Sequence, residues 1–334
     1  FNGQNNISGF QINPSYLMNK DLRWEAQHQF NLGLDLGLYN NRAVITADYY
    51  NKNIRNLLMD LELPPSAGYA RQTINVAEMN TKGFDFRIKV DLIKTSDFQW
   101  QTELNYSKFT SKVTSLQPGI DSLRPDLKVG EAPNSLIIGY VYDGLYQVGD
   151  SVMLRKLNAK PGSVKVKDMN NDGLLNANDM TIIGRTTPKG WGGLWNYWRY
   201  KGISLTVFAS YMFGHDIFNI AYQDYMYADG RRVVMKEALN YWTPTNTNTD
   251  IPRPNAFGEA VKTLPNGYSS FAVQRADFIK IRNITLGYDL PSTLLNKIRL
   301  SSANIYLQFT DPFIFTNYKG VDPEITQINT GTWS

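Results

Sequence analysis

Residues 83–109 show the clearest alternation of hydrophobic and polar side chains in this chain. Hydrophobic residues occupy every second position of two runs, 84–92 and 98–106, and the positions between them are mostly charged or polar. A period of two indicates β-strands whose successive side chains point to opposite faces. Each run is about ten residues long, about twice the usual length in globular proteins and enough for a tilted strand to cross a bilayer. The short polar segment 94–97 between the runs predicts a hairpin.

The same alternation recurs in three further pairs of runs. The predicted pairs are 30–38 with 43–49, 194–199 with 203–211, and 272–290 with 298–309, with turns near 39–42, 200–202 and 291–297. Much longer segments separate the hairpins, at 1–27, 52–80, 110–190, 214–270 and 310–334. Strict alternation of short and long connections is typical of outer-membrane barrels, which have short periplasmic turns and long extracellular loops. The pattern predicts an all-β, antiparallel transmembrane barrel segment of about eight strands, and a soluble β-sandwich is the alternative.

The two alternatives differ in what covers the hydrophobic face of the sheet. In a soluble sandwich, Phe84, Phe86 and Ile88 would pack beneath a second sheet. In a barrel they would face lipid, while Arg87 and Lys89 would line a hydrated interior. The bulk composition is compatible with both, since half of each barrel strand is polar.

Composition excludes several classes of protein. No run approaches the eighteen apolar residues that a transmembrane helix needs. The net charge is +4 over 334 residues, too weak and dispersed to indicate a nucleic-acid-binding protein. The chain has no Cys, which excludes disulfides and thiolate metal sites.

The two ends of the chain predict that it is part of a longer polypeptide. The sequence begins Phe1-Asn2-Gly3, with no initiating Met and no signal peptide. Both ends fall within predicted outer loops, whereas a complete barrel of even strand number has both termini on the periplasmic side. We therefore expect 1–334 to be an arc of a larger barrel, with further strands before it and at least one after it.

One segment matches the spacing of a calcium-binding loop. Oxygen donors lie at loop positions 1, 3, 5, 7, 9 and 12, namely Asp168, Asn170, Asp172, the Leu174 carbonyl, Asn176 and Asp179. Gly173 at position 6 permits the sharp turn of an EF-hand-type loop. Asp at position 12 replaces the usual Glu, as in dockerin-type loops. The hypothesis is a structural Ca²⁺ site that fixes an outer loop, and the alternative is an Asx-rich turn without metal.

The aromatic cluster around the third hairpin also has two interpretations. Its members are Trp191, Trp195, Tyr197, Trp198 and Tyr200. They could stack on sugars, but aromatic girdles form at the membrane interface of outer-membrane barrels. We favour the girdle for the residues near Tyr200.

Several motifs, in this order and spacing, resemble the SusC/RagA family of TonB-linked outer-membrane transporters of Bacteroidetes. They are Asp21-Leu22-Arg23-Trp24-Glu25, Asn31-Leu32-Gly33-Leu34-Asp35, Ala47-Asp48-Tyr49-Tyr50-Asn51-Lys52, Asn80-Thr81-Lys82-Gly83-Phe84-Asp85, Gly214-His215-Asp216-Ile217-Phe218-Asn219, Leu286-Gly287-Tyr288-Asp289-Leu290-Pro291 and Lys319-Gly320-Val321-Asp322-Pro323-Glu324. The resemblance covers essentially the whole chain and places it in the C-terminal part of a 22-stranded barrel in the bacterial outer membrane. The plug domain, the TonB box and the final strand are absent from this sequence.

The resemblance implies active import of glycans or peptides, with a SusD-like surface lipoprotein as lid and the TonB complex as energy source. It implies no catalysis. Two alternatives remain: a calcium-stabilised soluble carbohydrate-binding protein and an outer-membrane barrel enzyme. The enzyme would need a Ser–His pair, and the chain has only His28 and His215, with no local motif to support either.

Overall fold

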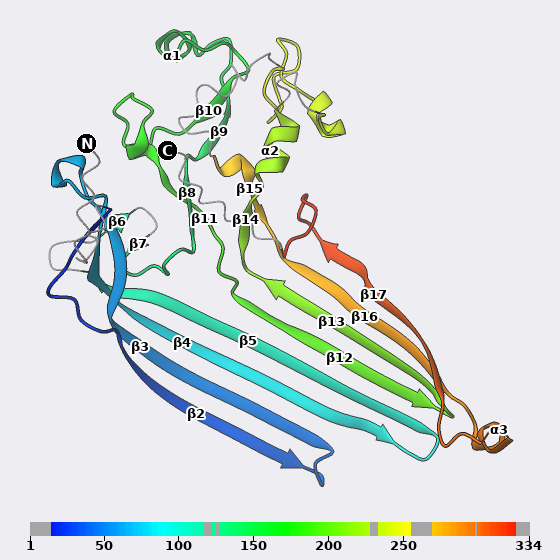
Figure 1. Ribbon diagram of the computed structural model, residues 1–334. Helices are drawn as coiled ribbons and strands as arrows, with labels where there is room; N and C mark the ends of the chain where they lie inside the picture. The colour runs from blue at the N-terminus through cyan, green and yellow to red at the C-terminus, as the bar shows by residue number, and fades with distance from the viewer. Residues whose placement is uncertain are drawn as a thin grey trace, which may run out of the picture. The chain divides into compact units, whose positions relative to one another are not determined.

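The computed structural model describes residues 15–116, 122–124, 127–227, 233–254, 269–297 and 299–324. Eight long strands form one hydrogen-bonded sheet in the order β17-β16-β13-β12-β5-β4-β3-β2 (Figure 1). The strands are β2 (Ala26–Leu38), β3 (Ala43–Glu62), β4 (Arg71–Lys94), β5 (Phe98–Leu116), β12 (Gly190–Tyr200), β13 (Ile203–Phe213), β16 (Phe278–Asp289) and β17 (Asn304–Thr316). The pairings from β5 through β17 are antiparallel. The all-β antiparallel class predicted from the period of two is confirmed.

The chain divides into two compact units. Unit 1 contains residues 1–31, 50–82 and 111–133, and unit 2 contains 32–49, 83–110 and 134–334. The strands β2 to β5 therefore contribute their turn-proximal parts to unit 2 and their far parts to unit 1.

Unit 1 corrects the predicted loops 52–80 and 110–190. β3 continues to Glu62, β4 begins at Arg71, and β5 continues to Leu116, so the first connection shrinks to 63–70 around η1 (Pro65–Ala67). Side chains of these extensions are buried, since Val76 and Ala77 of β4 and Val113 of β5 form a cluster with Leu127. β4 has 24 residues, about twice what a bilayer crossing requires. Pro64-Pro65 and Gly68, which lie within the predicted loop 52–80, mark only this short connection.

The remaining elements of unit 1 are short. β1 (Tyr16–Leu17) pairs in parallel with β4, and β6 (Ser122–Arg124) pairs with β7 (Leu127–Lys128). The Asn75 side chain exchanges two hydrogen bonds of 2.8 Å with the backbone of Arg23, which holds segment 19–25 against β4.

The short connections lie at one end of the sheet. β2 and β3 are joined by residues 39–42, of which Tyr39, Asn40 and Asn41 have positive φ. Residues 95–97 join β4 to β5, and Lys201-Gly202, both with positive φ, join β12 to β13. The fourth connection is longer than predicted, since 290–303 contains α3 (Ser292–Lys297).

At the opposite end of the strands of unit 2, two long segments fold into small elements (Figure 1). Residues 134–189 contain β8 (Leu136–Gly139), β9 (Tyr142–Leu145), α1 (Ser151–Lys156), β10 (Val164–Val166), η2 (Ala177–Asp179) and β11 (Thr181–Arg185). Residues 214–277 contain β14 (Asp216–Phe218), α2 (Ile220–Met226), η3 (Lys236–Leu239), η6 (Ser270–Ala272) and β15 (Val273–Arg275). We refer to these elements together as the outer region.

The outer region has its own hydrophobic core. Tyr140, Leu145, Val164, Val166 and Trp242 form one buried cluster, and Met226, Ala238 and Ile251 form another. Among the described helices, none is both long and apolar enough to cross a membrane.

Candidate functional site

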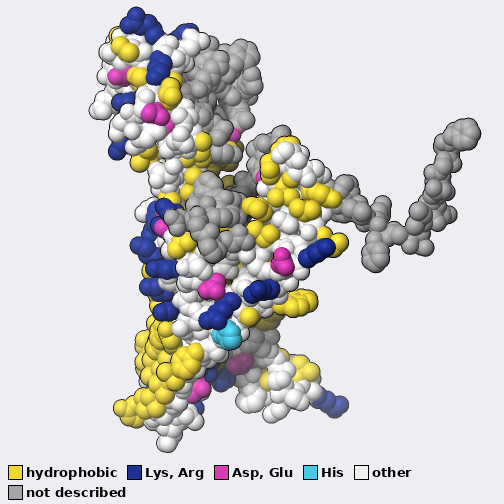
Figure 2. Space-filling model, turned by 90° about the vertical axis from the view of Figure 1, so that its left-hand side faces the viewer, with side chains coloured by type: hydrophobic (Ala, Val, Ile, Leu, Met, Phe, Trp, Pro, Cys, Tyr) yellow, Lys and Arg dark blue, Asp and Glu magenta, His cyan; other side chains and the backbone are white. Residues whose placement is uncertain are grey.

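One face of the sheet in unit 2 consists of continuous hydrophobic rows. The strand registers place Trp198 opposite Trp100 and Leu205. Leu205 lies opposite Leu286, which pairs in turn with Leu307. The next row is Phe98, Tyr200, Ile203, Tyr288 and Ile305. Protein does not cover this face, because Leu286 is 48% exposed although β16 lies between two strands. Figure 2 shows hydrophobic side chains gathered low on the left of its view, toward the turn end of the strands.

This exposure contradicts the soluble sandwich, in which the apolar face would be sealed. Phe84 is 40% exposed and stacks on Phe86, with ring centroids 6.4 Å apart. Sheets of water-soluble proteins do not leave apolar rows of this extent open.

The opposite face is polar and carries ion pairs. Arg87 donates two hydrogen bonds to the carboxylate of Glu103, at 2.7 and 2.8 Å. Trp195 lies on this face, directly opposite Glu103, and stacks on Tyr197 at 5.9 Å. The aromatic cluster is therefore divided by strand alternation: Trp198 and Tyr200 lie on the apolar face, as the girdle requires, whereas Trp195 and Tyr197 lie on the polar face.

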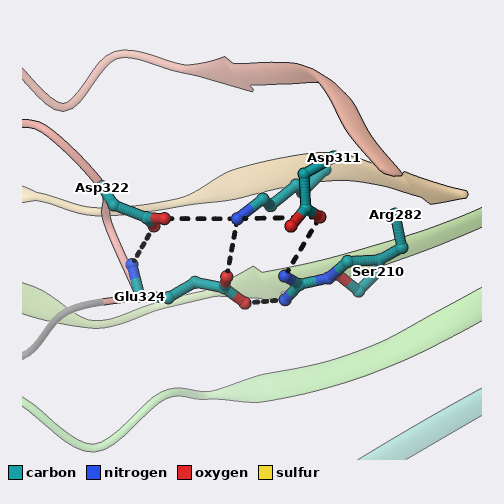
Figure 3. A network of polar contacts seen from close by, with 6 residues as sticks. Ser210, Arg282, Asp311, Asp322 and Glu324 are labelled. Atoms are coloured by element: carbon teal, nitrogen blue, oxygen red, sulfur yellow. Dashed lines mark hydrogen bonds and ion pairs between the residues drawn. The ribbon is translucent and has the colours of Figure 1, made fainter. Parts of the chain in front are cut away.

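A network of five charged side chains lies on the polar face where β13, β16 and β17 approach the outer region (Figure 3). The Lys280 ammonium lies 3.2 Å from Asp322, 3.2 Å from Glu324 and 3.9 Å from Asp311. Arg282 pairs with Asp311 at 3.6 Å and with Glu324, and its Nε donates to Ser210 Oγ at 2.8 Å. The network fixes residues 317–324, which follow β17, against the sheet.

A β-bulge brings the network together. The register shifts at Arg282 between β13 and β16, and again between β16 and β17. Asp311, in β17, has φ +49° and precedes Pro312. Bulges redirect side chains, and this one allows Lys280 and Arg282 to reach the same carboxylates. Burial favours the neutral form of Asp322, but the Glu324 backbone N–H and the Lys280 ammonium outweigh it and lower the pKa of Asp322.

His215 is buried next to this region, with 1% of its surface exposed. Burial lowers the pKa of His215, and the Pro323 backbone partly opposes the shift. Neither ring nitrogen makes a hydrogen bond of normal geometry to a described residue, so the Ser–His pair that a barrel enzyme would need is not formed there. His28 is exposed on β2.

The predicted calcium loop folds as a set of Asx turns. Asp168 Oδ2 accepts from Gly173 N at 2.7 Å, Asn170 Oδ1 accepts from Asp172 N at 3.0 Å, and Asp172 Oδ1 accepts from Leu174 N at 2.7 Å. Gly173 has φ +73°, the conformation for which position 6 requires glycine.

Asp179 closes the loop. It is completely buried, and its two carboxylate oxygens each accept a 2.9 Å hydrogen bond, from Met169 N and Asn176 N. The bond from Asn176 lowers the pKa of Asp179, burial opposes it, and further backbone bonds from Met169 and Asn170 add to the lowering. Within the described chain no three His, Cys, Asp or Glu side chains form a ready-made metal-binding group.

Most of the chain matches a known protein family. Residues 1–306 match the family described as TonB dependent receptor-like, beta-barrel. This chain belongs to that family. TonB-dependent receptors are outer-membrane proteins, so the hydrophobic rows of this TonB-dependent receptor barrel face lipid and its polar face lines the barrel interior.

Named relatives extend the comparison. TonB-dependent receptor P3 of Formosa agariphila is 32% identical over 326 residues, covering 93% of this chain and 32% of the relative. TonB-dependent receptor SusC of Bacteroides thetaiotaomicron is 25% identical over 319 residues, covering 92% and 30%. This receptor chain thus spans about a third of the length of the curated relatives it matches.

The same part of the barrel is present in solved structures. The structure of the RagAB peptide transporter has a TM-score of 0.74 and 25% identity, covering 91% of this chain and 33% of that one. RagAB in its "open-open" state has a TM-score of 0.73 and 26% identity, covering 92% and 33%. The resemblance to SusC and RagA that the motifs indicated is confirmed.

Sequence reasoning missed the Lys280–Glu324 network, although two signals were present. Lys280 and Arg282 alternate with isoleucines in β16, and Asp322 and Glu324 belong to one of the motifs that carried the family resemblance. The bulge that joins them has no signature in the pattern of hydrophobic residues.

Proposed function

We propose that the full-length protein imports oligosaccharides or peptides across the outer membrane, with this chain as part of the barrel wall. The observation that carries the proposal is the match of nearly the whole chain to the RagAB peptide transporter. Such an importer would have apolar rows facing lipid, a polar inner face and a folded outer region, and this chain has all three. We further propose a SusD-like surface lipoprotein as partner and the TonB complex as energy source, as in the family that the chain resembles.

The substrate class is tested by gene deletion and growth on single nutrients. A strain lacking the full-length gene is expected to lose growth on one class of oligosaccharide or peptide, and the wild-type gene should restore it. Uptake of that labelled nutrient should stop when the proton-motive force is collapsed. Normal uptake of every glycan and peptide tested by the deletion strain would contradict the proposal, provided that no second barrel of the family is expressed.

A further inference from the structure

The Asp168–Asp179 loop contains a carboxylate oxygen that the protein leaves unsatisfied. Asp168 Oδ1 is buried and receives no N–H or O–H hydrogen bond from a described residue, while the Asp168 side chain is in contact with the carboxyl of Asp179. The other oxygen of the same carboxylate is bound by Gly173 N at 2.7 Å. A buried acceptor without a partner is destabilising, and more so when it is charged, so a cation bound at this atom would be stabilising.

The donors of the loop select a hard divalent ion. Carboxylates, Asn amides and a backbone carbonyl are all oxygen donors, and the loop contains no His. Six or more oxygens in a flexible loop suit Ca²⁺ better than Mg²⁺, which demands octahedral geometry and keeps several waters. The described carboxylates do not form a metal-binding group by themselves, so a Ca²⁺ site here requires the amide oxygens of Asn170 and Asn176 and the Leu174 carbonyl as further ligands.

The loop is continuous with the core of the outer region. Leu175 and Met180 pack against the cluster that contains Tyr140, Val164 and Trp242. On the other side, Lys156 at the end of α1 donates to the Gly173 carbonyl.

We propose that the Asp168–Asp179 loop binds one Ca²⁺ ion and that this ion clamps the loop to the core of the outer region. Asp168 supplies a ligand from its buried oxygen and Asp172 supplies one from the exposed part of the loop, while Asp179 holds the two ends of the loop through its hydrogen bonds to Met169 N and Asn176 N. Loss of the ion frees the loop, Leu175 and Met180, and loosens β8 to β11, while the barrel wall is unaffected. This inference does not depend on the transported substrate.

The test measures calcium binding to the purified full-length protein by titration calorimetry. The variants Asp168→Asn and Asp172→Asn are expected to bind one Ca²⁺ fewer per chain than the wild type, or to bind it at least about tenfold more weakly. Asp172 is exposed, so its substitution does not threaten folding. Asn171→Gly is the matched control within the loop: Asn171 is not a donor position, and its φ of +57° suits glycine.

Hydrogen exchange provides a second readout. Exchange is measured with calcium and with chelator. In the wild type and in Asn171→Gly, calcium should slow exchange in residues 168–180 and in β8 and β9. In Asp172→Asn it should have no effect. Equal stoichiometry and affinity in all four proteins, or exchange that is indifferent to calcium in the wild type, would overturn the proposal.

Discussion

Replacing Leu286 with arginine is expected to destabilise the barrel by about 1–3 kcal/mol, which lies between the cost of a cationic side chain at the bilayer midplane and its smaller cost at the interface. Leu286 lies in the row with Leu205 and Leu307, flanked by β13 and β17, and nearly half of its surface is uncovered by protein. In lipid, the guanidinium would have to leave the hydrocarbon or draw water into it. Urea unfolding of the full-length protein in lipid vesicles measures the change in the free energy of unfolding.

Thr285→Arg is the matched control, one residue earlier on the same strand. Thr285 lies on the polar face between Thr206 and Gln308, where an arginine would meet water and polar side chains. We expect a change below about 1 kcal/mol. If both variants were equally destabilised, or if Thr285→Arg were the worse of the two, the assignment of the faces would be wrong.

Lys280→Met is expected to release residues 317–324 from the sheet. The Lys280 side chain is 11% exposed and has three carboxylate neighbours, so its loss leaves Arg282 alone to balance them. Removing one partner of a fully buried pair costs about 3–5 kcal/mol, and the partial exposure of these carboxylates reduces the expected cost to about 1–3 kcal/mol. Hydrogen exchange in 317–324 should accelerate about tenfold or more.

Asp311→Asn provides the comparison for this effect. Asp311 is the most distant partner of Lys280, at 3.9 Å, and its side chain is 46% exposed. Its loss should change exchange in 317–324 by less than about threefold, since half-exposed ion pairs contribute little. Unchanged exchange in Lys280→Met would show that the segment is held by other contacts.

The hairpins of unit 2 could be predicted from the sequence because each residue's face is fixed by strand alternation. Val207 and Leu205 fall on the apolar face and Thr206 on the polar face, as their spacing requires. The alternation did not reveal where β3, β4 and β5 end, because beyond the bilayer the hydrophobic contrast weakens while backbone pairing continues. The predicted loop 52–80 is therefore too long, because the structure leaves only residues 63–70 between β3 and β4.

The two candidate sites also differ in how far the sequence alone reveals them. The Asp168–Asp179 loop was visible because its donors lie within twelve residues. The Lys280–Glu324 network joins residues 42 and 44 positions apart through a bulge, and no local spacing indicates such a contact. Trp195 and Trp198 were grouped as one cluster, although the alternation along β12 places them on opposite faces.

The assignment of the two faces is tested by a single-cysteine scan of β13, from Ile203 to Tyr211. Residues 1–334 contain no Cys, and any Cys elsewhere in the full-length protein is replaced first. Each full-length variant is spin-labelled in lipid, and its accessibility to oxygen and to a water-soluble nickel complex is compared. If the apolar face of β13 faces lipid, accessibility alternates with period two: labels at 203, 205 and 207 collide with oxygen, and labels at 204 and 206 collide with the nickel complex. If labels at 205 and 207 were shielded from both reagents, this face would lie in a protein interior and the lipid-facing assignment would be wrong.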